Sequence, residues 1–298
     1  MVRLTAPFGI LALTFALAGC DQKQAGSEQA PPAAPAASAA AAPTPQPPAK
    51  PTEVTFVKKV PTTGIKATFS RKTSTKFTMG EKAFRESSVM EAAFDVKASD
   101  EFRVTKGGLE VKELYTTSQD GTGSEKKSVS PLAGSSYVVT RNDDGKLAAL
   151  DSGGDKVSAS TLKLLSEEYG TFFEKSRDAE FLPDRALKLE EKLMPSSDTM
   201  LSALGIKDDG NTLIDGTEFF LKKIEADRSS FDVTMTMTQK IAGAGLRVRA
   251  KLKGQIDIRP DGAWIVGIDL KGPLTILDSK GDEKGSGDLS ISATQTLK

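Results

Sequence analysis

The stretch FDVTMTMT, residues 231–238, alternates strictly between apolar and polar side chains. The stretch LRVRAKLKGQIDIR, residues 246–259, continues this alternation, and WIVGIDL, residues 264–270, follows after the turn sequence RPDG, residues 259–262. A period of two is typical of a strand with one apolar and one polar face, and Asp-Gly between two such runs is a strong hairpin signal. These runs therefore predict an antiparallel sheet that is buried on one face and wet on the other.

Weaker strand patterns extend the prediction to both sides. Further strands are expected at 65–79, 88–105, 109–118, 135–141 and 289–293, with a turn at 142–145. Between them, apolar residues at helical spacing predict a helix from Ser160, taken as its N-cap, to Phe172. Two shorter helices are expected at Leu187–Met194 and at Asp198–Leu204, the latter capped by Gly205. The predicted fold class is α+β: an antiparallel β-rich body with curved sheets and a central helical segment.

A segment rich in alanine and proline precedes this body. Between Ala30 and Ala49 the chain has no charged, aromatic or large aliphatic residue, and eight of its fifteen prolines lie between Pro31 and Pro51. Such a composition buries too little apolar area to offset the entropy of ordering. Residues 21–53 are therefore expected to be a disordered tether, with a reach of up to about 3.1 Å per residue. A proline-rich partner ligand is the alternative.

The N-terminus carries the most specific motif of the chain. Arg3 precedes the apolar run PFGILALTFA, residues 7–16, which is too short to span a bilayer as a helix. The sequence LAGC then ends at Cys20, the only cysteine. This motif resembles the lipobox of bacterial lipoproteins. The resemblance implies cleavage before Cys20 and lipid attachment to that residue; a plain secretory signal with a chance cysteine is the alternative.

The predicted organisation has three parts. They are a signal peptide at 1–19, the lipidated cysteine and linker at 20–53, and an ectodomain at 54–298. Two sheet halves, 54–158 and 212–298, would flank the helices at 160–205. The resemblance implies a place in the bacterial cell envelope, with the body outside the cytoplasm. Asp21 favours the inner membrane by the rule of enteric bacteria, and the sequence leaves inner and outer membrane undecided.

Composition narrows the chemistry. The chain has 40 basic and 40 acidic residues and no histidine. The balance of charge gives no overall field that would attract nucleic acid, and no nucleic-acid partner is predicted. Without histidine there is no Ser-His or Cys-His pair and no imidazole ligand, and a lipidated Cys20 leaves no thiolate. We therefore expect a protein that is not an enzyme and has no obligatory cofactor; hydrolysis by paired carboxylates is the alternative.

One acidic segment, residues 207–218, resembles an EF-hand calcium loop. With Glu218 at the twelfth position, oxygen ligands fall at positions three, five, nine and twelve, and they are Asp209, Asn211, Asp215 and Glu218. Lys207 stands where the first aspartate is expected, and Thr212 stands where the turn requires glycine. A calcium site is thus one hypothesis, and an acidic turn that leads into a strand is the other.

Two faces of the predicted sheet suggest binding. Arg247, Arg249, Lys251 and Lys253 form a cationic stripe, which could meet anionic lipid headgroups or polysaccharide, or could be a solvated face that deters edge aggregation. Phe231, Met235 and Met237 form an apolar face, which could line a cavity for acyl chains or belong to an ordinary core. A cavity lined by this face invites an architectural comparison with the half-barrel carriers among bacterial lipoproteins.

The sequence therefore predicts a membrane-anchored envelope lipoprotein with a non-enzymatic binding or structural ectodomain. The alternative is a carrier or sensor of lipids or other apolar ligands in a half-barrel cavity. The expected partners are the membrane, through lipidated Cys20, and either an envelope protein or an apolar ligand.

Overall fold

The structure is a computed structural model that describes residues 51–59, 62–98, 101–117, 123–169, 180–203, 210–241 and 245–298. Its elements, in chain order, are β1 (Glu53–Val54), β2 (Lys66–Met79), β3 (Lys82–Ala98), β4 (Glu101–Thr117), β5 (Gly123–Val129), β6 (Ser135–Arg141), β7 (Leu147–Asp151), α1 (Ala159–Tyr169), β8 (Leu187–Lys188), β9 (Lys192–Leu193), α2 (Ser197–Ala203), β10 (Thr212–Ile224), β11 (Ser229–Ile241), β12 (Leu246–Arg259), β13 (Trp264–Leu277) and β14 (Glu283–Leu297).

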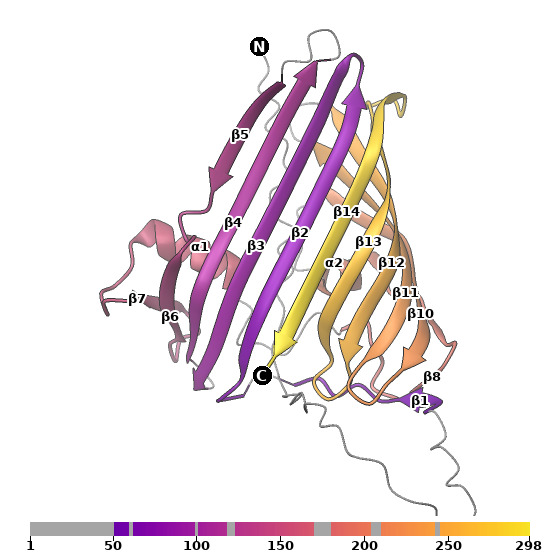
Figure 1. Ribbon diagram of the computed structural model, residues 1–298. Helices are drawn as coiled ribbons and strands as arrows, with labels where there is room; N and C mark the ends of the chain where they lie inside the picture. Colours follow the sequence, from indigo (N-terminus) through magenta and orange to yellow (C-terminus); the bar gives the residue numbers. More distant parts are fainter. Residues whose placement is uncertain are drawn as a thin grey trace, which may run out of the picture.

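Nearly all strands belong to one antiparallel sheet of twelve strands. Its order is β7-β6-β4-β3-β2-β14-β13-β12-β11-β10-β9, and β5 pairs with β4. The sheet curls, so that β10 and β11 lie behind β13 and β14 in the view of Figure 1, and both helices lie on the inner side of the curl. The last strand, β14, pairs with β2 along its length, from Gly285 opposite Met79 to Leu297 opposite Ala67.

The predicted α+β class is wrong. The described residues contain two short helices beside fourteen strands, so the fold is a predominantly antiparallel β structure. The expected helix at Leu187–Met194 is replaced by the short strands β8 and β9, which pair with β1 and β10. Leucine, lysine and glutamate favour helix locally, but strand pairing with distant segments overrides that preference here.

The boundaries of other elements also differ from the sequence prediction. The strands expected at 88–105 and 109–118 are instead β3 and β4, of seventeen residues each. The pair Gly107-Gly108 does not end β4. The strand continues through these residues with a shift of its register against both neighbouring strands. Helix α1 is capped by Ser158, whose Oγ accepts a 3.1 Å hydrogen bond from the Thr161 N–H, so the predicted cap at Ser160 is wrong.

The strongest sequence patterns are confirmed. Strands β11, β12 and β13 pair in the predicted antiparallel order, and a turn at residues 260–263 joins the last two. The apolar side chains of all three strands face a single core, which also contains residues from the segments inside the curl. Those inner residues are Phe56, Leu132, Leu165, Phe181, Leu182, Leu187, Met200 and Leu201. The strand register thus places one face of the sheet against the core and leaves the other polar face outside.

Candidate functional site

The apolar face of β11 belongs to the core. Phe231 has no exposed surface, and Met235 and Met237 are each 4% exposed. The Phe231 ring lies 6.0 Å from the Phe219 ring and 5.9 Å from the Phe56 ring, measured between centroids. Phe56 comes from the segment ahead of the sheet, so the chain's own side chains fill the space next to Phe231. Of the two readings of this face, the ordinary core fits this packing.

A cavity of about 330 Å³ lies elsewhere, where the β2–β3 hairpin meets the start of β14. Its lining comes from three adjacent strands, and the residues are Lys76, Phe77, Thr78, Ala83, Phe84, Arg85, Ser286, Gly287 and Asp288. This volume is at the lower end of the range for small-molecule sites, which starts at about 300 Å³. The cavity is therefore large enough for a small ligand or for one part of a longer one.

Local sequence explains why the three strands meet in this way. Met79 pairs with Lys82, so β2 and β3 are joined by a two-residue turn in which Gly80 has a φ of 58°. Gly287 lies opposite Phe77 on the neighbouring strand. A Cβ on Gly287 would lie 1.9 Å from the Lys76 carbonyl oxygen. Glycine at this position thus permits a close backbone approach that any other residue would prevent.

The lining combines an aromatic pair with charge. Phe77 and Phe84 are cross-strand partners, and their rings stack at 4.7 Å between centroids with 15° between planes. Lys76 is in register with Arg85 on one side and with Asp288 on the other. Lys76, Arg85 and Asp288 leave a net positive charge on one face of the three strands, and the alternation of side chains along a strand puts the Phe77 and Phe84 rings on the opposite face, where Phe77 packs against the core. The charged face can attract an anion, and the aromatic face can bind an apolar group.

The residues of the predicted calcium loop lie as follows. Asp209 lies outside the described residues, and Asn211 directly precedes β10. Asp215 and Glu218 both lie on β10, where the register shifts between them, and Glu218 pairs with Lys192 at 2.6 Å. Among the described residues, no three acidic, histidine or cysteine side chains form a group that could hold a metal ion. Calcium binding stays a prediction; the entry into a strand agrees with the other interpretation.

Cys20 and the motif around it lie outside the described residues. Of the helices that the structure describes, none has the length and apolar character needed to cross a membrane.

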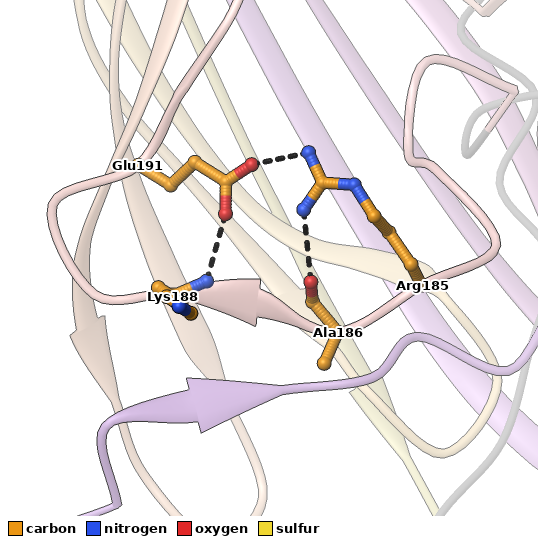
Figure 2. A network of polar contacts seen from close by, with 4 residues as sticks. All are labelled: Arg185, Ala186, Lys188 and Glu191. Atoms are coloured by element: carbon orange, nitrogen blue, oxygen red, sulfur yellow. Dashed lines mark hydrogen bonds and ion pairs between the residues drawn. The ribbon is translucent and has the colours of Figure 1, made fainter.

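A compact polar network lies at the turn between β8 and β9 (Figure 2). The Glu191 carboxylate accepts a hydrogen bond from the Arg185 guanidinium and another, of 2.9 Å, from the Lys188 backbone N–H. The Arg185 side chain also donates to the Ala186 carbonyl at 3.0 Å. Two backbone hydrogen bonds with Leu221 hold the same turn against β10. The Glu190 N–H donates to the Leu221 carbonyl at 2.8 Å, and the Leu221 N–H donates to the Glu191 carbonyl at 3.0 Å. The network therefore fastens a turn to the neighbouring strand.

This network predicts a small acid sensitivity. The hydrogen bond from Arg185, and then that from the Lys188 backbone, hold the pKa of Glu191 below its ordinary value. A lowered carboxyl pKa adds stability above the unfolded pKa, and that stability is lost as the pH falls through the folded pKa. Glu191→Gln should therefore lower the urea midpoint slightly at neutral pH, and the gap to wild type should close in acid. A gap that persists at low pH would contradict this.

Sequence reasoning missed the cavity entirely. Its nine lining residues come from two ends of the body, and Thr78 donates a 3.4 Å hydrogen bond to Ser286, which is 208 positions away. No local sequence pattern predicts that pairing. The nearest signal was the polar alternation of residues 284–292, which marks an outward strand face but not its neighbour.

No protein-family model matches the sequence, and no curated protein matches it. Among solved structures, a lipovitellin structure titled for lipid–protein interactions has 9% identity and a TM-score of 0.38; the match covers 79% of this chain and only 25% of lipovitellin. DynF from the dynemicin biosynthesis pathway of Micromonospora chersina has 10% identity and a TM-score of 0.22, over 82% of this chain and 88% of DynF. An outer membrane channel from Pseudomonas putida F1 has 7% identity and a TM-score of 0.21, over 81% and 97%. Similarities this weak establish neither a family nor a function.

Proposed function

We propose that this protein is a lipid-anchored lipoprotein of the bacterial cell envelope whose sheet domain is a non-enzymatic binding module for a small anion. The observation that carries the binding role is the cavity at the β2–β3 hairpin, whose lining includes the cross-strand cations Lys76 and Arg85. The lipobox motif that ends at Cys20 supports the anchor. The absence of histidine from the whole sequence supports a role without catalysis.

The cavity is tested with an anionic dye, whose charge complements that of Lys76 and Arg85. Anilinonaphthalene sulfonate has an aromatic body and one negative charge, and its fluorescence rises in apolar sites. We expect saturable binding to the full chain and an affinity about tenfold lower in Arg85→Gln, because a charge-assisted hydrogen bond contributes about 1.5–3 kcal/mol. Lys72→Gln is the matched control, since Lys72 lies on the same face of β2 but outside the cavity lining. Equal affinity in both variants would argue against this site.

A lipid carrier is the second candidate, because the stacked Phe77–Phe84 pair offers an apolar contact on the inner face of the same strands. The room next to Phe231 is filled, so such a ligand would have to sit at the β2–β3–β14 end. Native mass spectrometry of the protein purified gently from its envelope distinguishes the two roles. A copurifying lipid that is lost in Phe77→Ala would favour the carrier, and a bare polypeptide mass would favour a module that binds its ligand transiently.

The anchor makes a separate prediction. Cys20→Ser should abolish the incorporation of labelled fatty acid, and the protein should shift from the detergent-rich to the aqueous phase. The physical reason is that each buried methylene contributes about 0.8 kcal/mol, so that several acyl chains hold a protein at a membrane effectively permanently. Ser38→Ala, in the expected tether, should leave labelling unchanged. Labelled fatty acid on the Cys20→Ser protein would rule out this lipidation site.

A further inference from the structure

The outer face of β12 and β13 carries a concentration of positive charge that the cavity does not use. We define the basic patch as Arg249, Lys251, Lys253 and Lys271. All four side chains are exposed, on the face of the sheet opposite to the core. Because the chain has equal numbers of acidic and basic residues, this excess is a matter of placement and not of composition.

The strand register brings the four cations together. Arg249, Lys251 and Lys253 follow one another on β12 at intervals of about 7 Å, the spacing of alternate residues on a strand. Lys253 lies directly opposite Lys271 of β13. Like charges in directly opposite positions destabilise a sheet, so this pair has a cost in the protein alone. A bound anion would remove that cost.

The neighbours of the patch do not neutralise it. On the β11 side, the residues opposite Arg249, Lys251 and Lys253 are neutral threonines: Thr238, Thr236 and Thr234. Carboxylates occur only at diagonal positions on the border: Asp232, Asp269 and Asp288. Within the described part of the chain, none of the four patch cations makes a hydrogen bond or an ion pair.

Two further cations extend the patch along the sheet, and these are engaged. Lys240 donates a 3.2 Å hydrogen bond to the Gly210 carbonyl, and Arg247 donates one of 3.1 Å to the Ser279 carbonyl. Both acceptors are uncharged carbonyl oxygens, so these hydrogen bonds do not neutralise the positive charge of either side chain. The patch therefore continues as a cationic band toward the end of the sheet that carries the β13–β14 turn.

We propose that the basic patch binds the phosphate-bearing headgroups of an anionic lipid surface. Its cations are spread along a strand and do not converge on one point, which fits charge distributed over a surface better than a single small anion. Each lysine or arginine near an anionic membrane strengthens binding about fivefold. The proposal rests in part on the proposed anchor, since a lipidated Cys20 would hold this face within reach of a membrane. Binding would orient the sheet domain with this outer face toward the lipid.

The test measures the affinity of the full chain for phosphatidylcholine vesicles with and without phosphatidylglycerol. The ratio of the two affinities cancels the contribution of the N-terminal segment, which all variants share. We expect a preference for the anionic vesicles that falls about 25-fold in Lys253→Gln/Lys271→Gln, as two cations are lost, and that disappears at high salt. The control is Lys146→Gln/Lys156→Gln, which removes one exposed lysine just before β7 and one just after it and should keep the wild-type ratio.

Three outcomes would overturn the proposal. They are no preference for anionic vesicles in the wild type, an equal loss in the patch and control variants, and binding to the soluble polyanion heparin without binding to anionic vesicles. The last would indicate a polysaccharide partner. Because both substitutions are at exposed positions, circular dichroism should show an unchanged fold. A negative result in the vesicle assay would not change the outcome of the dye titration or of the labelling of Cys20. The proposals can therefore be tested independently.

Discussion

Phe231→Ala should lower the free energy of unfolding by about 3–5 kcal/mol, the range for truncating a buried phenylalanine. Phe231 is fully buried on β11 and contacts aromatic rings from two other parts of the chain, Phe56 and Phe219. Phe219 in turn stacks on Phe181 at 4.4 Å. Removing the central ring leaves a cavity among aromatic neighbours that are held by the strands and cannot close it. Urea unfolding followed by circular dichroism measures the loss.

The same variant distinguishes a core position from a ligand site. Phe77→Ala is the matched control, because Phe77 stacks on Phe84 but is only half-buried at the margin of the core. Its loss of stability should be about 1–2 kcal/mol, in line with partial burial. Copurification of lipid should change in the opposite order, falling in Phe77→Ala and staying near wild type in Phe231→Ala. A stable Phe231→Ala protein with impaired binding would return the ligand site to β11.

The part of the fold that the sequence predicts is the part specified by local alternation. On β11 and β12 every second residue is apolar, and a one-residue slip would turn the whole apolar row outward, so the register is strongly determined. The Asp-Gly pair at residues 261–262 adds a turn that only a hairpin accommodates. Neither signal needs knowledge of a distant partner, which explains why β11, β12 and β13 agree with the prediction.

The rest depends on contacts between distant segments. The pairing of β2 with β14 joins strands that are far apart in the sequence. It creates the cavity from residues that no sequence window contains together. The helix prediction at Leu187–Met194 is wrong for the same reason: its side chains favour helix, but β1 and β10 provide strand partners. The apolar face of Phe231 was recognised as a face, yet the segment that covers it could not be identified from periodicity.

Two glycines explain the curl of the sheet, and hydrophobic periodicity does not reveal their role. Gly254 on β12 and Gly272 on β13 each face the neighbouring strand so closely that a Cβ would lie 1.8 Å from a carbonyl oxygen, of Asp269 and Lys251 respectively. Glycines inside a strand mark places where another backbone approaches closely or where a sheet bends. The two glycines act on the same strand pair, one from each side, next to the basic patch on β12.

Gly272→Ala should therefore destabilise the protein by about 3 kcal/mol, at the upper end of the usual cost of overpacking. The clash is with backbone, the Lys251 carbonyl oxygen at 1.8 Å and its carbon at 2.8 Å, and no side-chain rotation relieves it. Relief requires β12 and β13 to separate, which breaks ladder hydrogen bonds in the middle of the sheet. Urea unfolding again measures the loss, and hydrogen exchange should show weaker protection on both strands around residues 250–254 and 270–274.

Gly153→Ala is the control for the general cost of replacing glycine. Its Cβ would meet two carboxylate oxygens, of Asp151 at 3.3 Å and of Asp155 at 3.9 Å, and no backbone atom, in an exposed turn, so we expect a change within about 1 kcal/mol. If Gly272→Ala were as harmless as Gly153→Ala, the close approach of β12 and β13 would not exist in solution. The curl of the sheet would then need another origin, and the spacing of Lys251, Lys253 and Lys271 in the basic patch would change with it, because all three lie beside this contact.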